Sequence, residues 1–194
     1  MIMTKGLFYA LLETGQIKVT SEGLVTILGE YALFFPARVF LYWQDMLISK
    51  YKSEGKGIMY EMGRYQVTQA LKRYTKNLGI QKVDRTKIMT LTMKIISMIG
   101  HGTFRIGGYD FTKGTASISN PKLPLADAYR LTRPTSKEPT DFYVSGLLAG
   151  MMAALSGKDV KCVETKCLTK GDKICHFELS PMLKLKFKLP KARG

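Results

Sequence analysis

Three cysteines lie close together near the end of the chain, and cysteine thiolates are metal ligands or nucleophiles. They are Cys162, Cys167 and Cys175, and an odd number of cysteines is a poor basis for a disulfide framework. In a reducing compartment such a group indicates metal binding or a reactive thiol. Glu164 adds a carboxylate between the first two cysteines. Two thiolates with one or two carboxylates suit zinc, a borderline ion that accepts both sulfur and oxygen ligands.

A β-hairpin is expected to position these side chains. Residues 160–165 and 174–179 are predicted to be strands that flank the polar turn 169–173. Pairing of the two arms would bring Cys167 and Cys175 close to each other, as a shared metal ion requires.

Strand geometry leaves alternatives open at this hairpin. Side chains alternate along a strand, so Cys162 and Glu164 share one face while Cys167 falls on the other. A β-bulge or a strand end before Cys167 would turn its side chain towards Glu164. A rival ligand set, Cys162, Cys167, Cys175 and His176, requires the last two neighbours to converge, which a regular strand resists. The cysteines could also be buried, inert small apolar residues.

Apolar residues at helical spacing predict four helices, over residues 37–50, 57–78, 85–99 and 141–156. Pro36 stands where the first of these can begin, because an early helical position tolerates its missing N–H. Asp84 is placed to cap the third helix, and Gly100 and Gly157 are natural stops after the third and fourth. A further helical turn is expected within the proline-rich loop 120–139, near residues 125–129.

Strands are predicted over residues 7–12, 16–20, 103–109 and 115–119, in addition to the hairpin. Residues 183–189 alternate leucine or phenylalanine with lysine, which is typical of a half-exposed edge strand. Helices come mainly first and strands mainly later, so we expect an α+β fold with an antiparallel sheet. With 194 residues, the chain is expected to form a single domain, with N-terminal strands and helices in residues 1–80 and a basic tail strand in residues 181–194.

The helix predicted over residues 141–156 carries a stripe of small residues. Gly146, Gly150 and Ala154 recur every four residues, which allows another backbone to approach closely. The stripe serves either packing inside the chain or contact with the same helix of a second subunit. A homodimer is therefore expected.

The charge of the chain is +15 at neutral pH, from 30 basic and 15 acidic residues. Such a charge attracts nucleic acid or anionic lipid, although a lysine-rich solvated surface explains it equally. No stretch has the roughly 20 apolar residues that a membrane span needs. The N-terminus lacks the features of a signal peptide, and a cytoplasmic location is expected.

Residues 142–177 resemble the 4-vinyl reductase domain. The motif Glu-Thr-Lys-Cys at residues 164–167 and the motif Gly-Asp-Lys-Ile-Cys-His-Phe at residues 171–177 carry the resemblance, together with the helix sequence that follows Asp141. This family includes sensor domains of phenol- and toluene-responsive bacterial regulators, and stand-alone archaeal proteins described as predicted hydrocarbon-binding proteins. The resemblance implies helices packed on one side of a twisted antiparallel sheet, a fold related to the small subunits of the TRAPP vesicle-tethering complex. Residues 81–180 would form this region.

The resemblance also implies a zinc site on the C-terminal hairpin. Aromatic sensors of the family bind zinc through a cysteine at the start of the helix, a glutamate and two further cysteines. At the matching positions this chain has Asp141, Glu164, Cys167 and Cys175. Aspartate replaces the first cysteine, and it remains a legitimate zinc ligand.

Three functions follow as hypotheses. The first is a zinc-containing, non-catalytic domain that binds an apolar, aromatic or lipid-like small molecule as a sensor or adaptor, with ligand-binding residues that the sequence does not identify. The second is a nucleic-acid-associated basic protein, and the third is a reductase or its accessory factor. No glycine-rich cofactor loop supports the third. His101, where the third helix meets a strand, stands at a possible pocket mouth but is also typical of a turn.

Overall fold

The computed structural model describes residues 2–77 and 83–182. Within these residues the elements follow in the order α1 (Ile2–Glu13), β1 (Ile17–Val19), β2 (Val25–Ile27), β3 (Glu30–Tyr31), α2 (Ala37–Tyr51), α3 (Ser53–Asn77), α4 (Arg85–Ile96), β4 (Arg105–Asp110), β5 (Thr115–Asn120), α5 (Pro124–Thr132), α6 (Phe142–Ser156), β6 (Val160–Lys166) and β7 (Cys175–Pro181). The chain is therefore a mixture of helices and antiparallel strands, as predicted.

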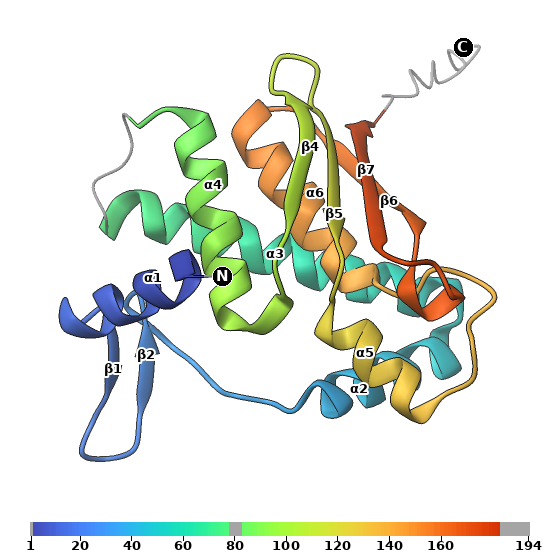
Figure 1. Cartoon of the computed structure of the whole chain (residues 1–194), viewed down its shortest axis with the longest axis horizontal. Coiled ribbons are helices and arrows are strands. Elements are labelled where there is room, and N and C mark those ends of the chain that lie inside the picture. Colours follow the sequence, from blue (N-terminus) through green and yellow to red (C-terminus); the bar gives the residue numbers. More distant parts are fainter. Residues whose placement is uncertain (1, 78–82, 183–194) are drawn as a thin grey trace, which may run out of the picture.

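The main sheet has the strand order β4–β5–β7–β6, and every neighbouring pair is antiparallel. Strand β5 shows why one face is covered, because Ala116 and Ile118 are buried whereas Ser117 and Ser119 on the opposite face are partly exposed. Helix α6 packs against β6 and β7, and α3 packs against α6 (Figure 1). The predicted arrangement, with helices on one side of an antiparallel sheet, is confirmed.

Helices α3 and α6 approach each other backbone to backbone. A methyl group on Gly146 of α6 would overlap the carbonyl oxygen of Tyr60 on α3, and one on Gly63 of α3 would overlap the carbonyl oxygen of Tyr143. The Cβ of an alanine at Gly150 would lie 2.7 Å from a methyl of Val67. The small-residue stripe on α6 is thus used inside the chain, and a second subunit would have to bind elsewhere.

The prediction of a strand over residues 7–12 is wrong, because this segment belongs to helix α1. Leu7 and Leu11, four residues apart, both pack into a small apolar cluster with Leu28 and Ile95. That spacing is helical, and a short apolar run does not by itself distinguish a strand from a helix. Gly15, with φ of 65°, makes the turn into β1, where the predicted strand over residues 16–20 is largely confirmed.

Helix boundaries follow local signals that the sequence partly revealed. Helix α3 begins four residues before its predicted start, because Lys52 alone, with φ of 53°, separates it from α2. Its predicted end at residue 78 lies outside the described residues. The Asp84 side chain accepts hydrogen bonds from the backbone N–H groups of Thr86 and Lys87, which confirms the predicted cap of α4. The helical turn predicted near residues 125–129 is the longer helix α5.

A π-helical turn, Ser97–His101, extends α4, and Gly100 with φ of 106° ends it near the predicted position. The tail strand predicted over residues 183–189 lies outside the described residues. Among the helices that the structure describes, none combines the length and apolarity required to cross a bilayer.

Candidate functional site

Four side chains from the ends of three elements meet at one point beside the main sheet. Asp141 immediately precedes α6, Glu164 lies on β6, Cys167 directly follows β6, and Cys175 begins β7. Their ligand atoms all lie within 4.8 Å of one another, and all four residues are buried. We call these four residues the donor cluster. The structure thus brings together the set that the resemblance implied.

A β-bulge turns Cys167 towards the rest of the cluster. The pairing of β6 with β7 shifts between Glu164, opposite Phe177, and Lys166, opposite His176. The extra residue at this shift breaks the strict alternation of the strand. The bulge predicted before Cys167 is therefore confirmed.

Hydrogen bonds hold the cluster in place. Within it, Cys175 Sγ donates to Asp141 Oδ2 at 3.2 Å, and the backbone N–H of Asp141 donates to Glu164 Oε2 at 3.1 Å. The backbone N–H of Leu168 donates to Cys175 Sγ at 3.4 Å. Such contacts from outside a metal's ligands orient those ligands and tune their basicity.

A second group of polar contacts ties the cluster to α2. Gln44 is buried, and its amide donates to the carbonyl oxygen of Thr140 at 3.1 Å. The Thr140 hydroxyl lies 3.1 Å from that of Thr169, which is 3.0 Å from Cys167 Sγ. The residue before Asp141 is thereby fixed both to a helix and to the hairpin turn.

Burial makes the cluster costly to ionise in the absence of a cation. Desolvation raises the pKa of Asp141 well above its usual range, and the nearby Glu164 carboxylate raises it further. Desolvation also raises the pKa of Glu164 to about 8. A hydrogen bond from Cys175 lowers the pKa of Cys167 to about 6, and the same contact raises the pKa of Cys175. One thiolate therefore forms readily, while the other three groups resist a further negative charge.

A divalent cation fits this arrangement. Glu164 Oε1 is buried and has no hydrogen-bond partner among the described residues. None of the ion pairs found in the described part of the chain involves Asp141 or Glu164. Buried carboxylates are normally paired or coordinated to a metal. Two sulfur and two oxygen donors match the ligands that zinc accepts in four-coordinate sites.

The rival ligand set is not brought together. The backbone N–H of Cys162 donates to the Tyr60 hydroxyl, and the Cys162 side chain lies apart from the donor cluster. The His176 ring is on the partly exposed side of β7, where its Nε2 lies 2.6 Å from Glu178 Oε1 and 3.3 Å from Ser117 Oγ. Cys175 and His176 thus point to opposite faces, as expected for strand neighbours.

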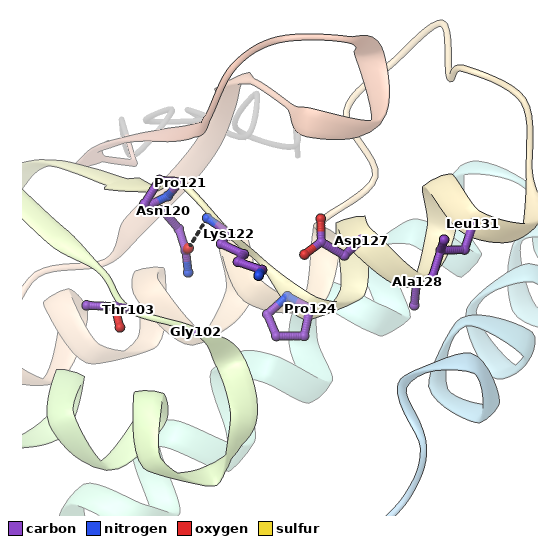
Figure 2. Close-up of a pocket in the computed structure, with 9 residues that line it drawn as sticks. All are labelled: Gly102, Thr103, Asn120, Pro121, Lys122, Pro124, Asp127, Ala128 and Leu131. Atoms are coloured by element: carbon purple, nitrogen blue, oxygen red, sulfur yellow. Dashed lines mark hydrogen bonds between the residues drawn. The ribbon is translucent and has the colours of Figure 1, made fainter. Parts of the chain in front are cut away.

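An open pocket lies where β5 ends and α5 begins. Its volume is about 610 Å³, and its lining residues are Gly102, Thr103, Asn120, Pro121, Lys122, Pro124, Asp127, Ala128 and Leu131 (Figure 2). Asn120 shapes one wall, because its amide donates to the carbonyl oxygen of His101 and accepts from the N–H of Lys122, each at 3.0 Å. Burial lowers the pKa of His101 to about 4, so this ring beside the pocket is neutral at physiological pH.

Sequence reasoning identified His101 but missed the residues that line this pocket. Most belong to the proline-rich segment from Asn120 to Leu131, whose prolines were recognised only as signs of a loop. The concave surface arises where this segment meets residues 102–103, and sequence spacing does not reveal such a contact.

Comparisons with known proteins agree with this geometry. Residues 128–181 match the family model of the 4-vinyl reductase domain. No functionally curated protein matches the sequence. The phenol-responsive sensory domain of the transcription activator PoxR, solved with phenol, has a TM-score of 0.76 at 12% sequence identity, covering 89% of this chain and 88% of that one.

Two further solved structures share the fold. A vinyl-4-reductase family protein from Methanocaldococcus jannaschii has a TM-score of 0.51 at 17% identity, covering 78% of this chain and 84% of that one. Subunit 3 of the trafficking protein particle complex from Naegleria fowleri, covalently bound to palmitic acid, has a TM-score of 0.53 at 12% identity, covering 75% and 92%. The predicted kinship with aromatic sensors and TRAPP small subunits is confirmed at the level of the fold.

The region matched to the family model contains the whole donor cluster and the hairpin that carries most of it. This chain therefore carries a 4-vinyl reductase domain at residues 128–181.

Proposed function

We propose that the protein is a zinc-containing domain that binds an apolar, aromatic or lipid-like small molecule and acts as a sensor or adaptor without catalysing a reaction. The observation that carries the proposal is the donor cluster, with four buried ligand atoms within 4.8 Å of one another. An unpartnered carboxylate oxygen inside that cluster supports a bound cation.

Zinc in this cluster would have a structural role. When bound, it would supply positive charge and a fixed tetrahedral geometry. Four protein ligands leave no open position for a substrate or an activated water. Asp141 would attach the start of α6, and Glu164, Cys167 and Cys175 would attach both arms of the hairpin. The folding free energy of the hairpin would thereby depend on the metal.

Binding of a small molecule is supported by the fold and by the open pocket. The PoxR domain, which shares the fold over most of both chains, is described as phenol-responsive, and the similar trafficking subunit carries palmitic acid. The pocket of about 610 Å³ has the size of a typical small-molecule site. Pro121, Pro124, Ala128 and Leu131 give it an apolar lining, and Lys122 and Asp127 offer polar groups at its rim.

A group that resembles a catalytic triad supports the non-catalytic proposal on closer inspection. Ser117, His176 and Glu178 contact one another on the outer face of the sheet. Both oxygens approach the same ring nitrogen, Nε2. A general base needs its orienting carboxylate on the other nitrogen, as in the serine hydrolases.

We also propose a cytoplasmic location and a homodimer. All three cysteines are free thiols and buried, which suits a reducing compartment. The dimer has to form away from the glycine stripe of α6, which α3 already covers.

Metal analysis combined with native mass spectrometry tests the zinc proposal on the protein as purified. We expect one zinc per chain. Cys175→Ser should lose it, whereas the control Cys162→Ser, also at a buried cysteine, should retain it. Equal metal content in both variants, or none in the unaltered protein, would contradict the assignment.

Thermal unfolding tests ligand binding separately. Phenol and palmitate are the probes, because the fold is shared with proteins that carry these molecules. A ligand that binds only the folded state raises the midpoint with concentration. Ala128→Trp, which fills the pocket, should remove this rise while zinc stays bound. A rise that survives Ala128→Trp would place the ligand elsewhere.

A further inference from the structure

Large apolar side chains are exposed along one stretch of the chain, from the end of β3 to the middle of α2. Each is between 50% and 80% exposed, and they are Tyr31, Leu33, Phe34, Phe35, Tyr42 and Met46. We call these six residues the aromatic patch. Residues 32–36 form neither helix nor strand, and Figure 1 shows them crossing from the small sheet to α2 without another element over them. Consecutive exposed apolar residues indicate a binding surface.

Contacts join the two parts of the patch. The ring of Phe35 packs edge-on against that of Trp43 on α2, with centroids 5.0 Å apart. Tyr42 and Met46 are four residues apart, so they lie one above the other on the exposed side of the same helix. The extended segment and the face of α2 therefore form one surface.

The area of the patch matches that of a stable protein interface. A large apolar side chain has about 200 Å² to bury. With the observed exposures, the six side chains offer on the order of 800 Å² together. A standard stable interface buries about 800 Å² on each partner.

The charge around the patch identifies the partner. The whole chain carries +15, and two copies repel each other across most of their surfaces. No lysine occurs between Lys18 and Lys50, where Arg38 is the one basic residue and Glu22, Glu30 and Asp45 are acidic. The patch thus lies in a stretch without the excess of cations found in the rest of the chain. An anionic membrane would instead require lysine and arginine around the apolar residues.

We propose that the aromatic patch is the interface through which two copies of this chain associate. Its composition suits this role, because tyrosine, tryptophan, phenylalanine, methionine and arginine are enriched at protein interfaces and lysine is depleted. The proposal is independent of zinc and of the small-molecule ligand.

Sedimentation velocity across a range of protein concentrations tests the proposal. Tyr42→Lys should weaken dimerisation at least about tenfold, because each copy then places a charge in the interface. Tyr65→Lys is the matched control, since Tyr65 on α3 is 69% exposed and Tyr42 is 65% exposed, and both changes add the same charge. Phe34→Lys is a second patch variant, and circular dichroism confirms folding of all three.

Two further readouts separate this surface from other ways of associating. Salt should strengthen the dimer, because it screens the repulsion between two basic copies, whereas it would weaken an interface held by ion pairs. Trp43 is the single tryptophan and contacts Phe35, so its emission should shift to the red as dilution separates the copies.

A monomer at all concentrations and salt levels would overturn the proposal, as would a dimer that Tyr42→Lys and Phe34→Lys leave intact. Binding to vesicles of anionic lipid that both patch variants abolish, with no dimer in solution, would assign the patch to a membrane and overturn it as well.

Discussion

Glu164 offers the sharpest test of the electrostatics inside the donor cluster. Its carboxyl is buried, and Oε1 has no hydrogen-bond partner among the described residues. Burial raises the pKa of Glu164 from 4.5 to about 8 in the protein without metal. An acid with a higher pKa in the folded state binds more protons there than in the unfolded state. Stability therefore falls as pH rises above the unfolded value, until the folded value is passed.

The informative variant is Glu164→Gln, which preserves the shape of the side chain and removes its ionisation. Each pH unit in the affected range corresponds to about 1.4 kcal/mol. Between pH 4.5, the ordinary pKa, and pH 6, the metal-free wild type should lose about 2 kcal/mol more of its unfolding free energy than the variant. The range ends near pH 6 because Cys167, whose pKa is lowered to about 6, begins to ionise there.

The assay is urea unfolding of chelator-treated protein at several pH values, followed by circular dichroism. Other groups, such as His101 with a pKa of about 4, titrate equally in both proteins and cancel in the difference. A loss of about 2 kcal/mol is a large part of the roughly 5 to 15 kcal/mol that stabilises a typical domain, so it is well resolved. Parallel stability curves for the two proteins would refute the buried position of this carboxyl. Zinc should abolish the loss in the wild type, because the bound cation favours the ionised form.

Other predictions concern helix packing, capping and metal affinity. Gly146→Ala should lower the free energy of unfolding by about 3 kcal/mol or more, because the new methyl overlaps the carbonyl oxygen of Tyr60. Gly57→Ala, in a helix with open space around the site, should instead be neutral or stabilising by up to about 1 kcal/mol in the same denaturant titration. Asp84→Ala should cost about 1 kcal/mol through loss of the two cap hydrogen bonds, whereas Asp84→Asn should restore most of it. Asp141→Cys should raise zinc affinity in a chelator competition, because thiolate is a softer ligand than carboxylate; an unchanged affinity would place Asp141 outside the metal's ligands.

The sequence was most informative where local chemistry determines structure. The helix over residues 37–50, the Asp84 cap and the hairpin arms were predicted because spacing, capping and turn residues act over a few positions. The bulge before Cys167 followed from strand alternation combined with the requirement that three ligands share one face. These parts of the fold need no knowledge of distant contacts.

Other features depend on tertiary contacts that spacing does not encode. Residues 7–12 form a helix because Leu7 and Leu11 meet Leu28 and Ile95, which come from other parts of the chain. The glycine stripe predicted close helix packing, but only the fold identified α3 as its partner. Asp141 is separated from the hairpin by the whole of α6, and only the family resemblance pointed to it. The pocket needed the contact of two segments, and it was missed.

Zinc X-ray absorption on the protein as purified tests the central claim most directly, because it reports the atoms bound to the ion. We predict two sulfur neighbours at about 2.3 Å and two oxygen neighbours at about 2.0 Å, from the two cysteines and two carboxylates of the donor cluster. A first shell without sulfur, or protein that contains no zinc after growth in zinc-replete medium, would contradict it.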